Sequence, residues 1–224
     1  MDFSFYKTEM LDVIIEDIAF KILQINNVDE LFERLIAKGA QHEDVKDERI
    51  PYWAELWPAA IGMSQYLIQK QIIQARQRVL EIGCGLGLPG IVAGKLGATV
   101  TLTDYMDDAL VFAKRNWDLN HPGQNAQFVK MDWREPDPAL AADVVLASDV
   151  TYEQRFFEFL LPAFKTLCKP GGRILISDPN RGAATGFFEQ MNRAGFINNQ
   201  RQYAVKPIKS GALIEVSVYE LTLS

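Results

Sequence analysis

The sequence has few of the residues that build disulfide frameworks and metal centres, with two cysteines and two histidines in 224 residues. Cys84 and Cys168 stand alone in different segments, so no Cys/His cluster has metal-ligand spacing and no bound metal is expected. The N-terminus lacks both the basic start and the apolar run of a secretory signal peptide. Two reduced thiols without such a signal are typical of a cytosolic protein, so we expect a cytoplasmic localisation.

Long apolar stretches and an excess of positive charge are also missing. Polar or charged residues interrupt every hydrophobic run before the roughly 20 residues that cross a bilayer, so membrane insertion is not expected. With 23 basic against 29 acidic residues, the formal net charge is -6, the wrong sign for gripping a phosphate backbone over a broad face. We therefore expect neither a membrane nor a nucleic acid as a partner.

The chain does contain the material for one large core. Hydrophobic residues make up 48% of it, and a length of 224 residues favours a single large domain. Residues 41–49 are mostly polar and show no periodicity, so we expect them to form an exposed connection. This connection predicts an N-terminal α+β extension over residues 1–49 and a main domain over residues 50–224.

Strands alternate with helices along the main domain, which is typical of a doubly wound, mostly parallel α/β sheet covered on both faces. In the extension, residues 17–25 predict a strand, and a helix with one apolar face follows. Two strands around a turn at 209–211 predict a C-terminal antiparallel hairpin, which gives a Rossmann-like sheet of seven strands. The expected strands are 78–82, 99–103, 126–131, 143–148, 173–177, 198–206 and 212–223, and the expected helices are 58–73, 88–96, 107–120, 154–167 and 183–194.

The strongest local signal is residues 79–87, a strand that runs directly into a glycine-dense turn and then a helix. Such a turn lets the backbone approach a ligand closely, although it can also serve packing alone. Residues 85–90 fit the dinucleotide fingerprint G-x-G-x-x-G, with Asp104 about 20 residues on, so a nicotinamide-dependent oxidoreductase is one alternative. Glu81 favours S-adenosylmethionine, because a carboxylate would repel a pyrophosphate but not a sulfonium ligand with an amino group.

Acidic and aromatic residues stand at the ends of the next two predicted strands. Asp104 could accept hydrogen bonds from both ribose hydroxyls of an adenosine, and its alternative role is to cap the following helix. Asp132 and Trp133 end the third strand at the same edge of the sheet, where they could contact the exocyclic amine and the ring face of an adenine. Ordinary surface and core positions are the alternative for this pair.

Asp149 and Tyr152 follow the fourth strand, where ligands react in open α/β sheets. A carboxylate three residues from a phenol can hold an incoming amine by hydrogen bonding and help its proton leave. The alternatives are a capping role for Asp149 and a packing role for Tyr152. We interpret both as candidate catalytic residues.

With these features, the chain resembles a seven-strand class I methyltransferase over nearly all of residues 50–224. It is more narrowly similar to methyltransferase family 16, which contains protein-lysine methyltransferases such as the one that modifies the beta subunit of electron transfer flavoprotein. Asn180 departs from the glycine of the flavoprotein-modifying members. The stretches that carry the similarity are Pro51-Tyr52-Trp53-Ala54-Glu55-Leu56-Trp57-Pro58, the D-x-x-Y motif Asp149-Val150-Thr151-Tyr152, and Ser177-Asp178-Pro179-Asn180-Arg181.

The resemblance implies that the cofactor is S-adenosylmethionine, with S-adenosylhomocysteine as its product. It also implies that Asp149 and Tyr152 face the target amine. The implied cofactor contacts are Trp57 as a cover, Gly83, Cys84 and Gly85 at the methionine portion, Asp104 at the ribose, and Trp133 and Ser148 beside the adenine.

We therefore hypothesise a methyltransferase that acts on nitrogen, with a lysine side chain of a protein as the expected acceptor. Lysine must first lose a proton, and its free pKa of about 10.4 makes that loss costly at neutral pH. Burial would lower this pKa, whereas pairing with Asp149 would raise it, so we expect Asp149 to position the amine first and to deprotonate it second. The alternatives are a small-molecule amine as acceptor and a non-catalytic cofactor-binding protein.

Overall fold

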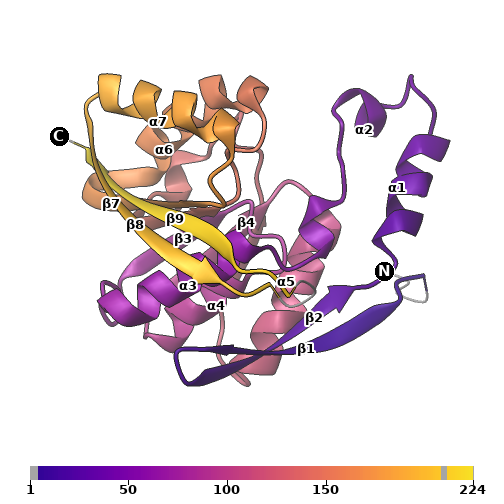
Figure 1. The fold of residues 1–224 in the computed structure, drawn as a ribbon, viewed down its shortest axis with the longest axis horizontal. Coiled ribbons are helices and arrows are strands. Elements are labelled where there is room, and N and C mark those ends of the chain that lie inside the picture. The colour runs from indigo at the N-terminus through magenta and orange to yellow at the C-terminus, as the bar shows by residue number, and fades with distance from the viewer. Residues whose placement is uncertain (1–4, 208–210, 224) are drawn as a thin grey trace.

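A seven-stranded sheet forms the centre of the protein in the computed structural model, which describes residues 5–207 and 211–223 (Figure 1). Neighbouring strands from β5 to β7 run parallel, while β9 is antiparallel to both β7 and β8. The expected doubly wound sheet with a C-terminal antiparallel hairpin is therefore confirmed. The turn was predicted at residues 209–211, of which 209 and 210 lie outside the described residues. The strand order is β5 (Gln127–Lys130), β4 (Thr99–Asp104), β3 (Arg78–Ile82), β6 (Ala142–Ser148), β7 (Cys168–Asp178), β9 (Ile214–Leu223) and β8 (Phe196–Val205).

Helices cover both faces of this sheet and bury two apolar cores. Successive strand residues point to opposite faces, so Leu146 joins one core and Val145 the other. Strands that are buried on both sides read as continuous apolar runs, as β6 does. None of the described helices is long and apolar enough to cross a membrane. One face carries α3 (Pro58–Lys70), α4 (Leu88–Lys95) and α5 (Asp107–Asn120), and the other carries α6 (Phe157–Leu167) and α7 (Gly182–Arg193).

The N-terminal segment forms a hairpin, β1 (Thr8–Ile15) and β2 (Ile18–Ile25), which packs on α5. The side-chain amide of Asn116 binds the backbone of Leu23 in both directions, at 2.7 and 3.2 Å. Inward-facing residues of the hairpin belong to the same core as α3, α4 and α5. Two further helices, α1 (Val28–Ala37) and α2 (Glu43–Lys46), stand out from the sheet (Figure 1).

Close packing between α4 and α5 leaves no room for a side chain at Gly94. A methyl group there would overlap the indole ring of Trp117. We expect Gly94→Ala to lower the free energy of unfolding by about 1–3 kcal/mol, the usual cost of overpacking. Gly186→Ala in α7 is the matched control, because nothing lies within 4 Å of its added methyl group and alanine favours a helix by about 0.5–1 kcal/mol. Urea unfolding of both variants tests this; equal midpoints would contradict it.

Candidate active site

A cavity of ≈ 350 Å³ opens at the carboxyl ends of the parallel strands. This is the edge of an open α/β sheet at which ligands bind, and the volume lies within the usual range of small-molecule sites. Every site residue that the sequence predicts lines this one cavity: Trp57, Glu81, Gly83, Cys84, Gly85, Asp104, Asp132, Trp133, Ser148, Asp149 and Tyr152.

The turn between β3 and α4 brings bare backbone to the cavity. Gly83 and Gly85 have φ angles of 58° and 49°, in the left-handed region that side chains disfavour. A methyl group at Gly83 would lie 3.0 Å from the ring of Trp133. Cys84 lies between these two glycines. Burial raises the pKa of its thiol well above the usual value, so the thiol stays protonated and cannot act as a nucleophile.

Glu81 is buried at the end of β3, beneath the start of α4. Its Oε2 accepts a hydrogen bond from the amide of Gly90 at 2.8 Å, and burial raises its pKa to about 8. In a dinucleotide site, free amides at this helix start would bind the pyrophosphate. Because the Glu81 side chain already accepts the hydrogen bond of the Gly90 amide, the structure disfavours the oxidoreductase alternative.

Asp104 ties the end of β4 to the glycine turn. Oδ2 accepts from the amide of Gly85 and Oδ1 from the amide of Met106, both at 2.9 Å. The capping alternative is wrong, because Met106 is the N-cap residue of α5. A carboxylate has about four acceptor positions, so Asp104, which lines the cavity at 8% exposure, keeps capacity for a ligand hydroxyl.

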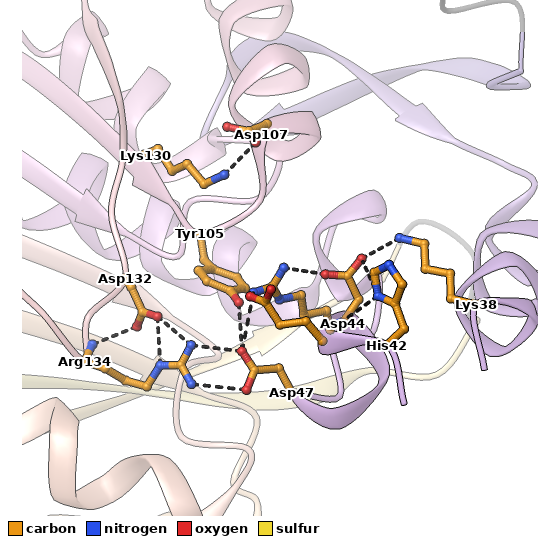
Figure 2. Close-up of polar contacts among 11 residues, drawn as sticks. Lys38, His42, Asp44, Asp47, Tyr105, Asp107, Lys130, Asp132 and Arg134 are labelled. Carbon is orange, nitrogen blue, oxygen red and sulfur yellow. Dashed lines mark hydrogen bonds and ion pairs between the residues drawn. The ribbon is translucent and has the colours of Figure 1, made fainter. Parts of the chain in front are cut away.

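Asp132 belongs to an ion network that the sequence did not indicate (Figure 2). Its carboxylate accepts from the amide and from Nε of Arg134, both at 2.8 Å. Arg134 also reaches Asp47 at 3.1 Å, and the hydroxyl of Tyr105 donates to the same carboxylate at 3.0 Å. These bonds lower the pKa of Asp47. Asp132 thus holds Arg134, and its contact with an adenine amine stays a prediction.

The network brings the end of residues 41–49, which the sequence predicted to be an exposed connection, to the cavity. Asp47, Glu48 and Arg49 all line it. A second ion pair joins Glu48 to Arg155 at 3.0 Å, from the turn that precedes α6. Two acidic residues of this segment, Asp47 and Glu48, therefore pair with arginines on distant loops.

Aromatic rings form one wall of the cavity. The indole of Trp57 donates to the carbonyl of Tyr52 at 2.6 Å, and the Tyr52 ring meets that of Tyr152 with centroids 5.4 Å apart. Phe156 continues the wall, 6.0 Å from Tyr152 and 5.7 Å from Trp133. Burial raises the pKa of the Tyr152 phenol, so it stays protonated and cannot act as a base at neutral pH. The sequence did not single out Tyr52 or Phe156 individually as site residues.

Asp149 is held in an unusual conformation by a bidentate ion pair. Its φ angle is 56°, and its amide donates to the carbonyl of Ser177 at 2.8 Å. Arg181 donates from Nε and Nη2 to the two carboxylate oxygens, at 3.0 and 2.9 Å. The capping alternative for Asp149 is wrong, because the N-cap residues of the next two helical segments are Glu153, before the turn Gln154–Phe156, and Phe156, before α6. Arg181 lines the cavity but was predicted only as part of a sequence stretch.

Three buried polar atoms of residues that line the cavity have no hydrogen-bond partner among the described residues. They are Oγ of Ser148, at the end of β6, Nε1 of Trp53 and Nε of Arg49. An unsatisfied buried donor costs about 1–3 kcal/mol, so native proteins rarely keep one without a function. All three atoms are available to a ligand with hydrogen-bonding groups.

Comparison with known proteins identifies relatives of this chain. It is 37% identical over 116 residues to the histone-arginine methyltransferase METTL23 of Xenopus laevis, covering 49% of each protein. It is 32% identical to the protein N-lysine methyltransferase METTL21A of Danio rerio, covering 77% of this chain and 78% of that protein. It is 30% identical to the electron transfer flavoprotein beta subunit lysine methyltransferase of Danio rerio, covering 58% of this chain and 51% of that protein. The match thus spans about half the length of two of these relatives.

Solved structures share the fold. The magnesium protoporphyrin IX methyltransferase of Synechocystis PCC 6803, solved with S-adenosylhomocysteine bound, has a TM-score of 0.57 and 16% sequence identity, with 89% of this chain and 95% of that one covered. The family model for lysine methyltransferases matches residues 42–194, which include all the cavity-lining residues from Asp47 to Arg181. The chain therefore belongs to the lysine methyltransferase family, within the Rossmann-like methyltransferase fold.

Proposed function

We propose that this protein is an S-adenosylmethionine-dependent methyltransferase whose acceptor is a lysine side chain of another protein. The observation that carries the proposal is the convergence of the glycine turn, Asp104 and the unpartnered hydroxyl of Ser148 on one cavity beside Asp149. Family membership supports the same activity.

The cavity residues fit the cofactor. Gly83 and Gly85 offer bare backbone for close approach, and Asp104 keeps acceptor capacity for ribose hydroxyls. Glu81, whose pKa burial raises to about 8, would provide negative charge for the amino group and the sulfonium once it ionises on binding. Ser148 and Trp133 would lie beside the adenine, with Trp57 as the cover.

S-adenosylmethionine would supply an activated methyl group: the lone pair of the amine would form a C–N bond to the methyl carbon as the C–S bond breaks, and S-adenosylhomocysteine would leave with the bonding electrons. The protein's own contribution is alignment, since a well-placed nucleophile needs little further help. Asp149 accepts a hydrogen bond from the amine and sets its direction. The aromatic rings of Tyr152 and Tyr52 line the cavity and would stabilise a positively charged product nitrogen by cation–π interaction.

The acceptor class rests on the relatives. Two of the three described above modify lysine on proteins, and one modifies arginine on histones. The net charge of -6 also favours a basic protein partner over an acidic one.

Calorimetric titration with S-adenosylhomocysteine, with NAD as the comparison, tests the cofactor. Micromolar binding of the former and none of the latter is expected. Incubation with tritiated S-adenosylmethionine and a protein extract, followed by amino-acid analysis of the labelled protein, tests the acceptor. Label in methyllysine supports the proposal, label in methylarginine redirects it to the other acceptor, and label in small molecules alone contradicts a protein substrate.

Glu81 makes the strength of cofactor binding depend on pH. With its pKa at about 8, the buried side chain is largely protonated near pH 7 in the ligand-free protein. A ligand with a cationic amino group favours the ionised form, so binding releases a proton and tightens as pH rises toward 8, by at most about tenfold per pH unit. Calorimetry with S-adenosylhomocysteine between pH 6 and 8 measures this dependence.

Two controls isolate the contribution of Glu81. Methylthioadenosine has no amino-acid portion, so its affinity is expected to stay nearly constant over the same pH range. Glu81→Gln cannot ionise and is expected to flatten the profile of S-adenosylhomocysteine. An unchanged slope in Glu81→Gln would assign the released proton to another group.

A further inference from the structure

We propose that Arg181 is a positioning residue that sets the charge of the acceptor site. By neutralising Asp149, it makes the site select an uncharged amine over an ammonium or guanidinium ion. This inference rests on the proposed function. It adds to it the role of Arg181 and the charge state of the acceptor that the site binds.

The Arg181–Asp149 pair has the geometry of a built contact. Both carboxylate oxygens receive a guanidinium N–H, at 3.0 and 2.9 Å. The Asp149 side chain is only 9% exposed, whereas that of Arg181 is 39% exposed. A bidentate contact fixes the relative orientation of its two groups, whereas an ordinary surface ion pair contributes little to stability. Two of about four acceptor positions on the carboxylate stay available for an amine N–H.

The backbone of Arg181 is fixed as firmly as its side chain. Its amide donates to Oδ1 of Asp178 at 2.7 Å, and Asp178 is fully buried. The other oxygen of Asp178 accepts from the hydroxyl of Thr151, also at 2.7 Å. Thr151 lies inside the D-x-x-Y motif, so the loops after β6 and β7 are joined at two points and Arg181 is held against Asp149.

Charge selection follows from this pairing. A lone carboxylate within about 4–6 Å of an amine raises the amine's pKa by about 1–3 units and so holds it in the unreactive ammonium form. With Arg181 bound, the pair has no net charge, and Asp149 can orient a neutral amine without favouring its protonation. An arginine acceptor, which always stays charged, would have to displace Arg181 from the same two oxygens.

Other titratable groups also act on this pair. The charges of Asp149, Asp178 and Tyr52 raise the pKa of Arg181, and burial raises the pKa of Asp178. Glu55, Tyr152 and Glu153 line the same cavity. Arg181 is the group that contacts Asp149 directly, so its removal changes the charge at the acceptor position most.

The test uses n-butylamine as a probe for a lysine side chain and n-propylguanidine for an arginine side chain. Each is titrated by NMR into the protein saturated with S-adenosylhomocysteine at pH 7, where both are cations. We expect Arg181→Gln to bind both at least about tenfold more tightly than the wild type, because the carboxylate is released. Arg181→Lys keeps the charge and is expected to behave like the wild type.

Arg193→Gln, at the far end of α7, is the control for net charge and should change neither affinity. The wild type alone gives a second reading, since its affinity for butylamine should rise from pH 7 toward pH 10 as the neutral form accumulates. Unchanged probe affinities in Arg181→Gln, or a wild-type affinity that does not rise with pH, would overturn the inference. Failure of the proposed function would appear separately, as absence of S-adenosylhomocysteine binding or of methyl transfer by the wild type.

Discussion

Asp149→Asn is expected to reduce methyl transfer about 100-fold or more while leaving S-adenosylhomocysteine binding within a few-fold of the wild type. The carboxylate orients the acceptor nitrogen, and misplacing a reacting group typically costs about 10²-fold in rate. Asparagine tolerates the left-handed backbone that Asp149 adopts at φ 56°, so the variant removes the charge with little strain. Labelled methyl transfer to the acceptor protein found in the extract measures the rate.

Asp143→Asn provides the matched control for this experiment. Asp143 lies near the start of β6, at the opposite end of the strand from Asp149, and pairs with Lys169 at 2.8 Å. Its replacement is expected to leave transfer nearly unchanged. Equal rates in Asp149→Asn and Asp143→Asn would remove Asp149 from the catalytic site, and a large loss of cofactor binding in Asp149→Asn would move it to the cofactor site.

Asp104→Asn is expected to weaken S-adenosylhomocysteine binding about 100-fold. The two oxygens of Asp104 accept from the amides of Gly85 and Met106, and a buried donor that loses its acceptor costs about 1–3 kcal/mol. An amide can present only one oxygen, so one of the two backbone donors would face an NH₂ group and the glycine turn would lose its support. Calorimetry measures the affinity, and thermal unfolding of the ligand-free variant separates lost binding from lost structure.

Asp107→Asn is the control at the same edge of the sheet. Asp107 is 60% exposed and pairs with Lys130, outside the cavity lining. Its affinity for S-adenosylhomocysteine should match the wild type. If Asp104→Asn also matched the wild type, Asp104 would support the fold without binding the ribose.

The sequence predicted the sheet well because its strands are buried on both faces. The strand at 78–82 and the helix at 107–120 have the predicted bounds, since apolar runs and helical periodicity dominate there. By contrast, β7 starts at Cys168, five residues before its predicted start, because Pro170 and two glycines resemble a turn. Strand β1 was missed, because the exposed Met10 and Ile14 hide its alternation.

Site residues were predictable where the topology alone brings them together. Parallel strands end at the same edge, so Asp104, Asp132 and Asp149 had to meet near one cavity. Their partners were not predictable, because each pairing depends on how separate loops approach each other. Arg134 binds Asp47 across 87 residues of sequence, and Arg181 binds Asp149 across 32.

The bonding of the N-terminal hairpin to α5 has a consequence for the order in which the chain can fold. Leu23 of β2 pairs with Asn116, 93 positions later in the sequence. A ribosome adding about 5–20 residues per second needs on the order of 5–20 s to produce that partner. Strands β1 and β2, which are synthesised first, therefore lack their packing partner on one face until α5 has been synthesised. Trp53 packs on Phe112 of the same helix, so the cofactor cavity can close only after more than half of the protein has been made.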